Sequence, residues 1–130
     1  MIKQPESIEK LVNELSKLPG VGKKTAQRYA YAIVEWPSEQ AAALISAISE
    51  VKERVGKCSV CGNYSETPVC EICQKRDKSV ICVVSYPKDV LAMERVSGFT
   101  GVYHVLGGVI SPIDGVFEDD LNIDGLIKRL

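Results

Sequence analysis

Apolar side chains recur at the spacing of a helical face near the start of the chain, which predicts consecutive amphipathic helices. The first helix covers residues 6–18, with Ser7 as its N-cap, and is ended by the proline and glycine that follow. The second begins near Gly22 or Lys23. We expect this second helix to bury four side chains: Ala26, Tyr29, Ala30 and Ile33.

A third helix opens at Pro37 and Ser38 and ends at Gly56, the residue type that most often follows a last helical turn. Its apolar face consists of Ala41, Leu44, Ile45, Ile48, Val51 and Val55. The three helices predict a helical domain over residues 1–56. Because three short helices provide only a thin core, we expect a second copy of the chain to cover the remaining apolar surface.

The pattern changes after a cysteine-bearing segment at residues 57–78. The run SVICVVSY at 79–86 is almost entirely apolar and β-branched, which is typical of a strand buried on both faces. Helical spacing returns at 87–98, and GVYHVL at 101–106 resembles a second strand. A strand, a helix and a strand predict a βαβ unit with parallel strands, followed by a short helix from about residue 119 to residue 130.

We therefore predict a multi-part α+β protein with a helical domain at 1–56, a small cysteine-bearing domain at 57–78 and a partial α/β domain at 79–130. A parallel sheet needs cover on both faces, which two strands and one or two helices do not provide. We accordingly expect the chain to be the front part of a longer protein.

Composition restricts the class of protein. The chain has 130 residues, of which 45% are hydrophobic and 25% charged, and its net charge is −1. These values are those of a globular protein and argue against one that coats nucleic acid over its whole surface. The N-terminus lacks the apolar core of a signal peptide, and no apolar run approaches the ~20 residues of a membrane span. We expect a cytoplasmic protein, whose cysteines stay reduced.

Positive charge gathers at the turn between the first two helices, in the stretch LPGVGKKTAQR. Gly20 and Gly22 permit a tight turn and a close approach of another backbone. The first N–H groups of the helix that follows have no partner within the helix, and its dipole is positive at this end, so the turn attracts anions. Lys24 and Arg28 lie four residues apart and therefore share a face beside the turn.

This pattern predicts a site for DNA phosphates that holds the backbone without reading its sequence. The residues that we expect to form it are Gly20, Gly22, Lys23, Lys24 and Arg28. Lys23 is secondary because it points about 100° around the helix from Lys24. A bulky β-branched residue at Gly22 is expected to distort the turn and block the phosphate. The alternative is a simple corner between helices with solvated lysines.

The stretch CSVCGNYSETPVCEIC holds two C-x2-C pairs separated by eight residues. Each pair directs two thiolates toward one point, and two pairs complete the tetrahedron that Zn²⁺ prefers. We predict one structural Zn²⁺ held by Cys58, Cys61, Cys70 and Cys73, with no open position for catalysis, which makes residues 57–78 a small zinc finger. The alternatives are a pair of redox dithiols or an iron–sulfur cluster.

Two further residues need no chemistry. Cys82 lies within the first predicted strand and is interpreted as a small buried hydrophobe. His104, the single histidine, lies on the second predicted strand and is interpreted as a core or edge-strand residue.

The order of these parts resembles the RecR family of bacterial recombination mediators over essentially the whole chain. LPGVGKKTAQR resembles a helix-hairpin-helix motif, the four-cysteine segment follows it, and ICVVSYPKDVLAMERV with GVYHVLGGVISPIDGV resembles the first half of a Toprim domain. Each motif is common by itself, but this order and spacing are specific.

The resemblance implies a non-enzymatic DNA-binding role in recombinational repair, with a homo-oligomer (a dimer or tetramer) that holds or encircles DNA. It also implies RecF and RecO as partners and help in loading RecA onto single strands covered by single-strand-binding protein. The lysine and arginine that contact DNA in the family correspond to Lys24 and Arg28. We expect no membrane partner and a place near the bacterial nucleoid.

The chain departs from the Toprim pattern at one informative position. Ser85 stands where a Toprim domain usually has an acidic residue after its first strand, and the later acidic motif would lie beyond Leu130. Toprim enzymes hold Mg²⁺ with those carboxylates, so metal-dependent strand chemistry is not supported. Two alternatives remain open: a Toprim-type Mg²⁺-dependent enzyme, and a zinc-containing adaptor that does not touch DNA.

Overall fold

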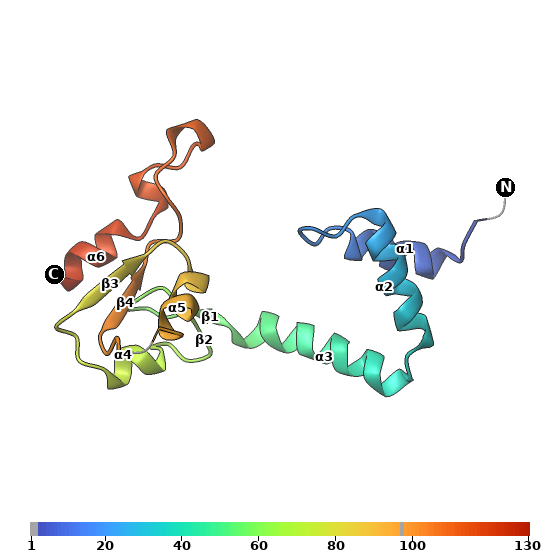
Figure 1. The fold of residues 1–130 in the computed structure, drawn as a ribbon, viewed down its shortest axis with the longest axis horizontal. Helices are drawn as coiled ribbons and strands as arrows, with labels where there is room; N and C mark the ends of the chain where they lie inside the picture. The colour runs from blue at the N-terminus through green and yellow to red at the C-terminus, as the bar shows by residue number, and fades with distance from the viewer. Residues whose placement is uncertain (1–2, 97) are drawn as a thin grey trace. The chain divides into compact units, whose positions relative to one another are not determined.

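The computed structural model describes residues 3–96 and 98–130, so residues 1 and 2 of the predicted first domain lie outside the described residues. The chain divides into two compact units, Met1–Glu50 and Val51–Leu130 (Figure 1). Within the described ranges no helix is both long and apolar enough to cross a bilayer.

The core of the N-terminal unit is formed by two helices, α1 (Glu6–Leu15) and α2 (Lys23–Glu35). Val12, Ala26 and Ala30 are buried between them, and the side chains that pack around this centre are Ile8, Leu11, Leu15 and Val21. Two alanines one turn apart let the helices approach closely. The predicted pair of amphipathic helices is thus confirmed.

The bounds of α1 differ from the prediction. Pro5, not Ser7, is its N-cap, and the Pro5 carbonyl accepts the first helical hydrogen bond from the Glu9 N–H at 3.1 Å. The helix ends at Leu15, and a turn leads to Gly20. Proline at the N-cap position supplies that carbonyl while its missing N–H costs nothing there.

Tyr29 was predicted to be buried in α2, and this is wrong, because 47% of its surface is exposed. It lies about 60° around the helix from Ala26, at the edge of the narrow contact with α1. On the α2 side the two alanines, Ala26 and Ala30, occupy the centre of that contact, and Ile33 is half-buried.

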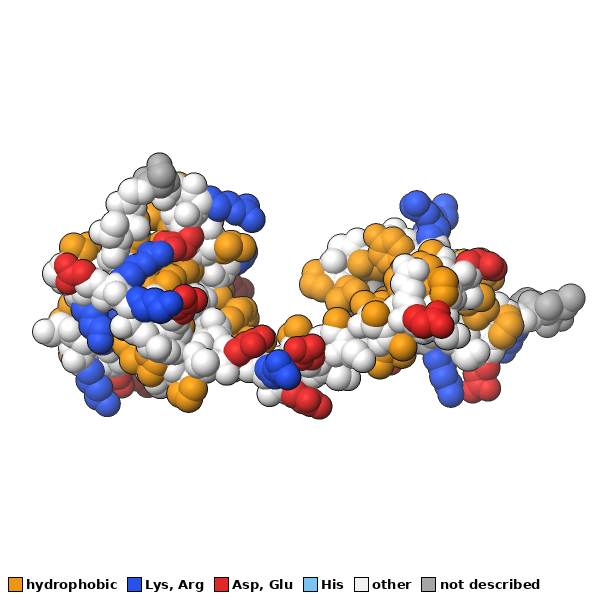
Figure 2. Space-filling view, turned by 90° about the horizontal axis from the view of Figure 1, so that it is seen from below, with side chains coloured by type: hydrophobic (Ala, Val, Ile, Leu, Met, Phe, Trp, Pro, Cys, Tyr) orange, Lys and Arg blue, Asp and Glu red, His pale blue; other side chains and the backbone are white. Residues whose placement is uncertain are grey.

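Helix α3 runs from Ser38 to Arg54, as the sequence predicts, but buries no side chain within either unit. Its apolar face is open: Ile45 is 66% exposed, Ile48 58% and Val51 57%. The space-filling view likewise shows hydrophobic side chains at the molecular surface (Figure 2). Helix α3 therefore contributes no buried side chain to the core of either unit.

The C-terminal unit opens with the cysteine-bearing segment. Strands β1 (Gly56–Lys57) and β2 (Tyr64–Ser65) form a short antiparallel hairpin, in which Gly56 pairs with Ser65. The short helix α4 (Glu71–Lys75) follows.

The predicted βαβ unit is present. Strands β3 (Ile81–Val84) and β4 (Val102–Val105) are parallel neighbours in one sheet, joined through α5 (Pro87–Glu94). Figure 1 shows α5 alongside these strands, and Val90 of α5 is buried against Tyr103 and Val105. Every residue of β4 is buried. The prediction that the first strand is covered on both faces is wrong, because Val83 is 46% exposed and Cys82 only half-buried.

The last segment contains two 3₁₀ helices, η1 (Pro112–Asp114) and η2 (Glu118–Asp120), and the helix α6 (Ile123–Arg129). It returns to β4 through side-chain and backbone contacts. His104 is fully buried; one ring nitrogen lies 2.7 Å from the Asn122 carbonyl oxygen and the other 3.0 Å from Arg129 Nη1. The prediction that His104 is a core residue is confirmed.

Candidate functional site

The structure brings the four predicted metal ligands together. Cys58 and Cys61 lie in the turn of the β1–β2 hairpin, Cys70 is the N-cap of α4, and Cys73 lies within that helix. All four are buried, and their sulfur atoms lie within 4.8 Å of one another. Sulfurs bound to one zinc at about 2.3 Å would lie about 3.8 Å apart, close to the 3.6 Å between the Cys61 and Cys70 sulfurs. The cluster therefore has the size and ligand chemistry of a tetrahedral Zn²⁺ site.

Backbone amides direct hydrogen bonds at the sulfur of Cys58. The N–H groups of Val60, Cys61 and Cys70 donate to it at 3.4, 3.4 and 3.3 Å. Burial by itself raises the pKa of Cys58, but these three donors outweigh it and lower the pKa to about 6. Donors to a ligating sulfur also fix its orientation toward the metal.

Two of the other thiols, those of Cys61 and Cys73, have raised pKa values. Burial, as the largest cause, raises the pKa of Cys61, and burial together with neighbouring thiols raises the pKa of Cys73 to about 12. Four thiolates in so small a volume repel one another strongly. A divalent cation at their centre relieves this repulsion, so the donor set requires a metal to become fully ionised.

Gly62 attaches the cluster to the sheet. Its φ of +81° is a conformation that favours glycine, and a Cβ at this position would lie 3.0 Å from the Val105 carbonyl oxygen. Val105 in turn donates its N–H to the Cys61 carbonyl at 2.7 Å. The turn that carries two metal ligands is thus joined directly to β4.

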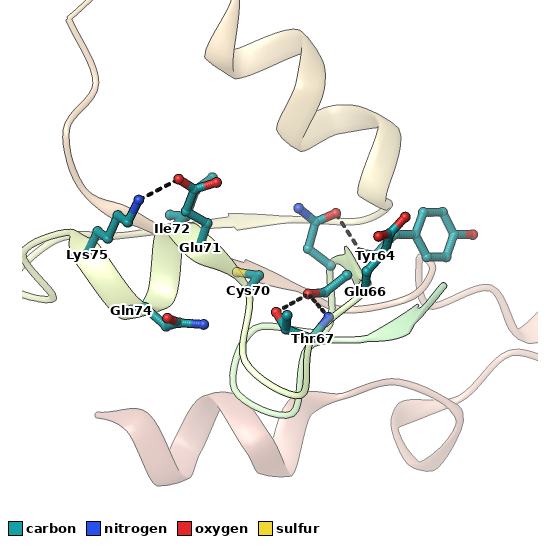
Figure 3. A pocket seen from close by; sticks show the side chains of 10 residues that line it. Tyr64, Glu66, Thr67, Cys70, Glu71, Ile72, Gln74 and Lys75 are labelled. Atoms are coloured by element: carbon teal, nitrogen blue, oxygen red, sulfur yellow. Dashed lines mark hydrogen bonds and ion pairs between the residues drawn. The ribbon is translucent and has the colours of Figure 1, made fainter. Parts of the chain in front are cut away.

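An open groove of about 550 Å³ lies beside the cluster (Figure 3). Several of its polar side chains are paired within the groove: Lys75 bonds Glu71 at 2.6 Å, and Thr67 donates its hydroxyl proton to the Val69 carbonyl at 2.7 Å. These groups are already satisfied, so they do not converge on a ligand.

The predicted phosphate site lies at the start of α2. Gly20 has a φ of +77°, and the Val21 N–H closes the turn on the Leu18 carbonyl at 3.1 Å. Gly22 is the N-cap of α2, so the helix begins at Lys23, as predicted. No acidic residue occupies the first turn of this helix.

The prediction that a bulky β-branched residue at Gly22 would distort the turn was wrong. Its φ of −81° is available to any residue, and a Cβ placed there meets no atom within 4 Å. Gly20 alone supplies the unusual backbone conformation of this turn. A side chain at Gly22 would therefore leave the turn intact and could act only on the approach of a ligand.

Lys24 and Arg28 are exposed and lie one turn apart on α2. Among the described residues neither has an ion-pair partner. Lys23 is exposed too, about 100° around the helix. The five residues of the predicted phosphate site thus lie in the turn before α2 and in the first half of that helix.

Sequence reasoning missed a polar cluster in the C-terminal unit. Arg76, just after α4, bonds the Glu94 carboxylate with two guanidinium nitrogens, and the Tyr103 hydroxyl donates to the same carboxylate at 2.5 Å. Nothing in the local pattern relates these three positions, because they come from three separate elements. The cluster fastens the metal-bearing segment to α5 and β4.

Comparisons with known proteins match three consecutive segments of the chain. The family model of the RecR helix-hairpin-helix matches residues 8–52, that of the RecR four-cysteine zinc finger domain matches 55–74, and that of the Toprim domain matches 79–129. The cysteine cluster is accordingly the metal site of a four-cysteine zinc finger.

Curated relatives match nearly the whole chain. Proteins named Recombination protein RecR from Tropheryma whipplei and Bifidobacterium adolescentis are 52% and 51% identical over 125 and 126 residues, in each case 95% of this chain and 63% of the relative. The one from Enterococcus faecalis is 48% identical over 128 residues, 97% of this chain and 65% of the relative. The chain thus spans a little under two thirds of the length of these relatives.

Fold and site together define a zinc-finger protein with a helix-hairpin-helix unit and a Toprim-like region. The chain belongs to the RecR family.

Proposed function

We propose that this chain is the DNA-holding, zinc-containing part of a recombination mediator that acts in DNA repair. The observation that carries the proposal is the exposed basic face of Lys24 and Arg28 beside the Gly20 turn. This basic face precedes a four-cysteine zinc finger in the sequence. The chain shares about half of its aligned residues with proteins named Recombination protein RecR.

The hairpin binds phosphate through three kinds of group. The free N–H groups at the start of α2 and its dipole favour an anion, and Lys24 and Arg28 add charge on one face. Gly20 keeps the turn narrow enough for a backbone to come close. None of these groups reads a base, so binding is independent of sequence.

By family resemblance, the partners are RecO and RecF, and the product of their action is RecA loaded on single strands. The chain acts in the cytoplasm, near the nucleoid, where the four ligand thiols stay reduced until metal binds. It has no enzymatic step of its own. Ser85, which directly follows β3, cannot take the Mg²⁺-binding role of a carboxylate.

Fluorescence anisotropy with a labelled oligonucleotide tests the proposal. Lys24→Ala with Arg28→Ala should weaken binding to every sequence alike and lower the slope of log affinity against log salt by roughly 0.7–0.9 per lost phosphate contact. Lys10→Ala with Lys52→Ala removes the same charge elsewhere on the chain and should bind like wild type. If the hairpin variant keeps both wild-type affinity and wild-type slope, the DNA site lies elsewhere.

The enzyme alternative has its own measurement. Incubation of the full chain with single-stranded and duplex DNA and Mg²⁺ should yield no cleavage. Metal-dependent cleavage that copurifies with the protein would show that the Toprim-like region is catalytic.

A further inference from the structure

An exposed aromatic residue lies on the same face of α2 as the basic pair. Counting 100° per residue, Arg28 lies about 40° to one side of Lys24 and Tyr31 about 20° to the other. The buried alanines, Ala26 and Ala30, occupy the opposite side of the helix. Tyr31 is 49% exposed and follows Arg28 by less than one turn.

The tyrosine ring is held at one end only. Its hydroxyl donates to the Gln4 side-chain oxygen at 3.2 Å, and Gln27 donates to the same oxygen at 2.5 Å. The ring is thus tethered at its rim while half of the residue stays open to solvent. A partly fixed aromatic side chain loses little conformational entropy when it binds a flat partner.

Two cations followed by an aromatic ring match the chemistry of a single nucleic-acid strand. The cations attract the phosphates, and the ring offers a surface on which a base can stack. In a duplex the base faces are already stacked on each other, and only phosphates are within reach of such a helix face. Glu35, one turn beyond Tyr31, ends the basic face with a negative charge.

We propose that Tyr31 is a base-stacking residue that gives the Lys24–Arg28 site a preference for single-stranded over duplex DNA. This inference rests on the proposed function, because the cations must first hold the phosphates. It adds a specificity-determining contact that phosphate binding alone does not supply.

Three labelled probes of equal length separate the contributions: a single strand, its duplex, and a strand of abasic sugar–phosphate units. With the full chain, Tyr31→Ala should weaken single-strand binding by at least about fivefold. Binding to the duplex and to the abasic strand should change by less than about twofold. The salt slope should stay at the wild-type value because no phosphate contact is lost.

Matched variants test whether the ring itself is responsible. Tyr31→Phe keeps the ring and loses only the bond to Gln4, so it should retain most of the single-strand binding that Tyr31→Ala loses. Tyr31→Leu keeps apolar bulk and helical propensity without a π-face, so it should behave like Tyr31→Ala. Tyr29→Ala removes an equally exposed tyrosine from a different side of α2 and should have no effect.

The inference is wrong if Tyr31→Ala weakens all three probes alike, if Tyr29→Ala does the same as Tyr31→Ala, or if Tyr31→Phe loses as much as Tyr31→Ala. It is also wrong if Tyr31→Ala converts an oligomer to a monomer with equal losses on all probes, since the ring would then belong to a contact between copies. Failure of the proposed function looks different: Lys24→Ala with Arg28→Ala would leave binding to every probe unchanged.

Discussion

At the scale of single residues, the cluster of Arg76, Glu94 and Tyr103 carries the clearest energetic argument. The Arg76 guanidinium, and next the Tyr103 hydroxyl, lower the pKa of Glu94 below its ordinary value. Burial and then the Glu94 carboxylate raise the pKa of Tyr103 to about 12. The folded chain therefore keeps Glu94 ionised and Tyr103 protonated, which is the arrangement that both hydrogen bonds require.

Glu94→Gln should destabilise the C-terminal unit by about 1 kcal/mol, because it removes the charge that pairs with Arg76 across partly exposed surface. Urea unfolding followed by circular dichroism measures this loss. Glu71→Gln is the matched control: its ion pair with Lys75 is mostly exposed to solvent, so no measurable change is expected. Equal losses from the two variants would show that Arg76 and Glu94 form only a surface pair.

The same carboxylate gives a pH dependence of known sign. Since folding lowers the pKa of Glu94, its contribution is complete above the ordinary glutamate value of 4.5 and is lost as pH falls through the lower folded value. The difference in urea midpoint between wild type and Glu94→Gln should therefore be constant near neutral pH and shrink below about pH 4.5. A difference that persists unchanged into acid would contradict this assignment.

At the scale of elements, pattern and spacing predicted most of what depends on local order. The bounds of α2 and α3, the parallel pairing of β3 with β4, and the meeting of the four cysteines all follow from periodicity or spacing. Two predictions of burial were wrong, because burial depends on residues from other elements that a local sequence pattern does not contain. Tyr29 has helical spacing for burial but lies at the edge of a contact whose α2 side is centred on two alanines, and Val83 lacks cover on one side.

The zinc finger should bind one Zn²⁺ per chain, and a strong chelator should remove its order, since so few large apolar side chains support the segment. Metal analysis of protein purified without added zinc measures the first, and loss of protease resistance after chelation measures the second. Cys82→Ser should leave the zinc content unchanged because Cys82 lies on β3, outside the cluster. Clearly less than one equivalent of zinc, or iron in its place, would reject the assignment.

At the scale of the whole molecule, the two units are unequal in their cores. Among the described residues, the core of the N-terminal unit has three buried side chains between α1 and α2, and α3 contributes none. One face of α3 carries Ile45, Ile48 and Val51, each more than half exposed. A contiguous apolar surface of this kind is uncommon on a monomeric protein. We infer that a second copy covers this face, as the thin helical core led us to expect from the sequence.

Sedimentation at micromolar concentration should accordingly find an oligomer, and Ile48→Asp should shift it toward the monomer by placing a charge within the apolar face. Ser46→Asp adds the same charge on the opposite side of α3 and should leave the oligomer intact. A monomeric wild-type chain would refute this inference, and so would equal effects of the two substitutions.

The hydrogen bond between Val105 and Cys61 has a consequence for the order of folding. The four ligands lie close together in the sequence, so metal binding closes only short loops and proceeds early. The β4 strand is distant in the chain and must find its place later, and the metal-bound turn at Cys61 and Gly62 offers it a preformed edge on which to settle. We therefore expect zinc to speed the docking of β4, so that chains made in zinc-poor medium form the βαβ unit more slowly.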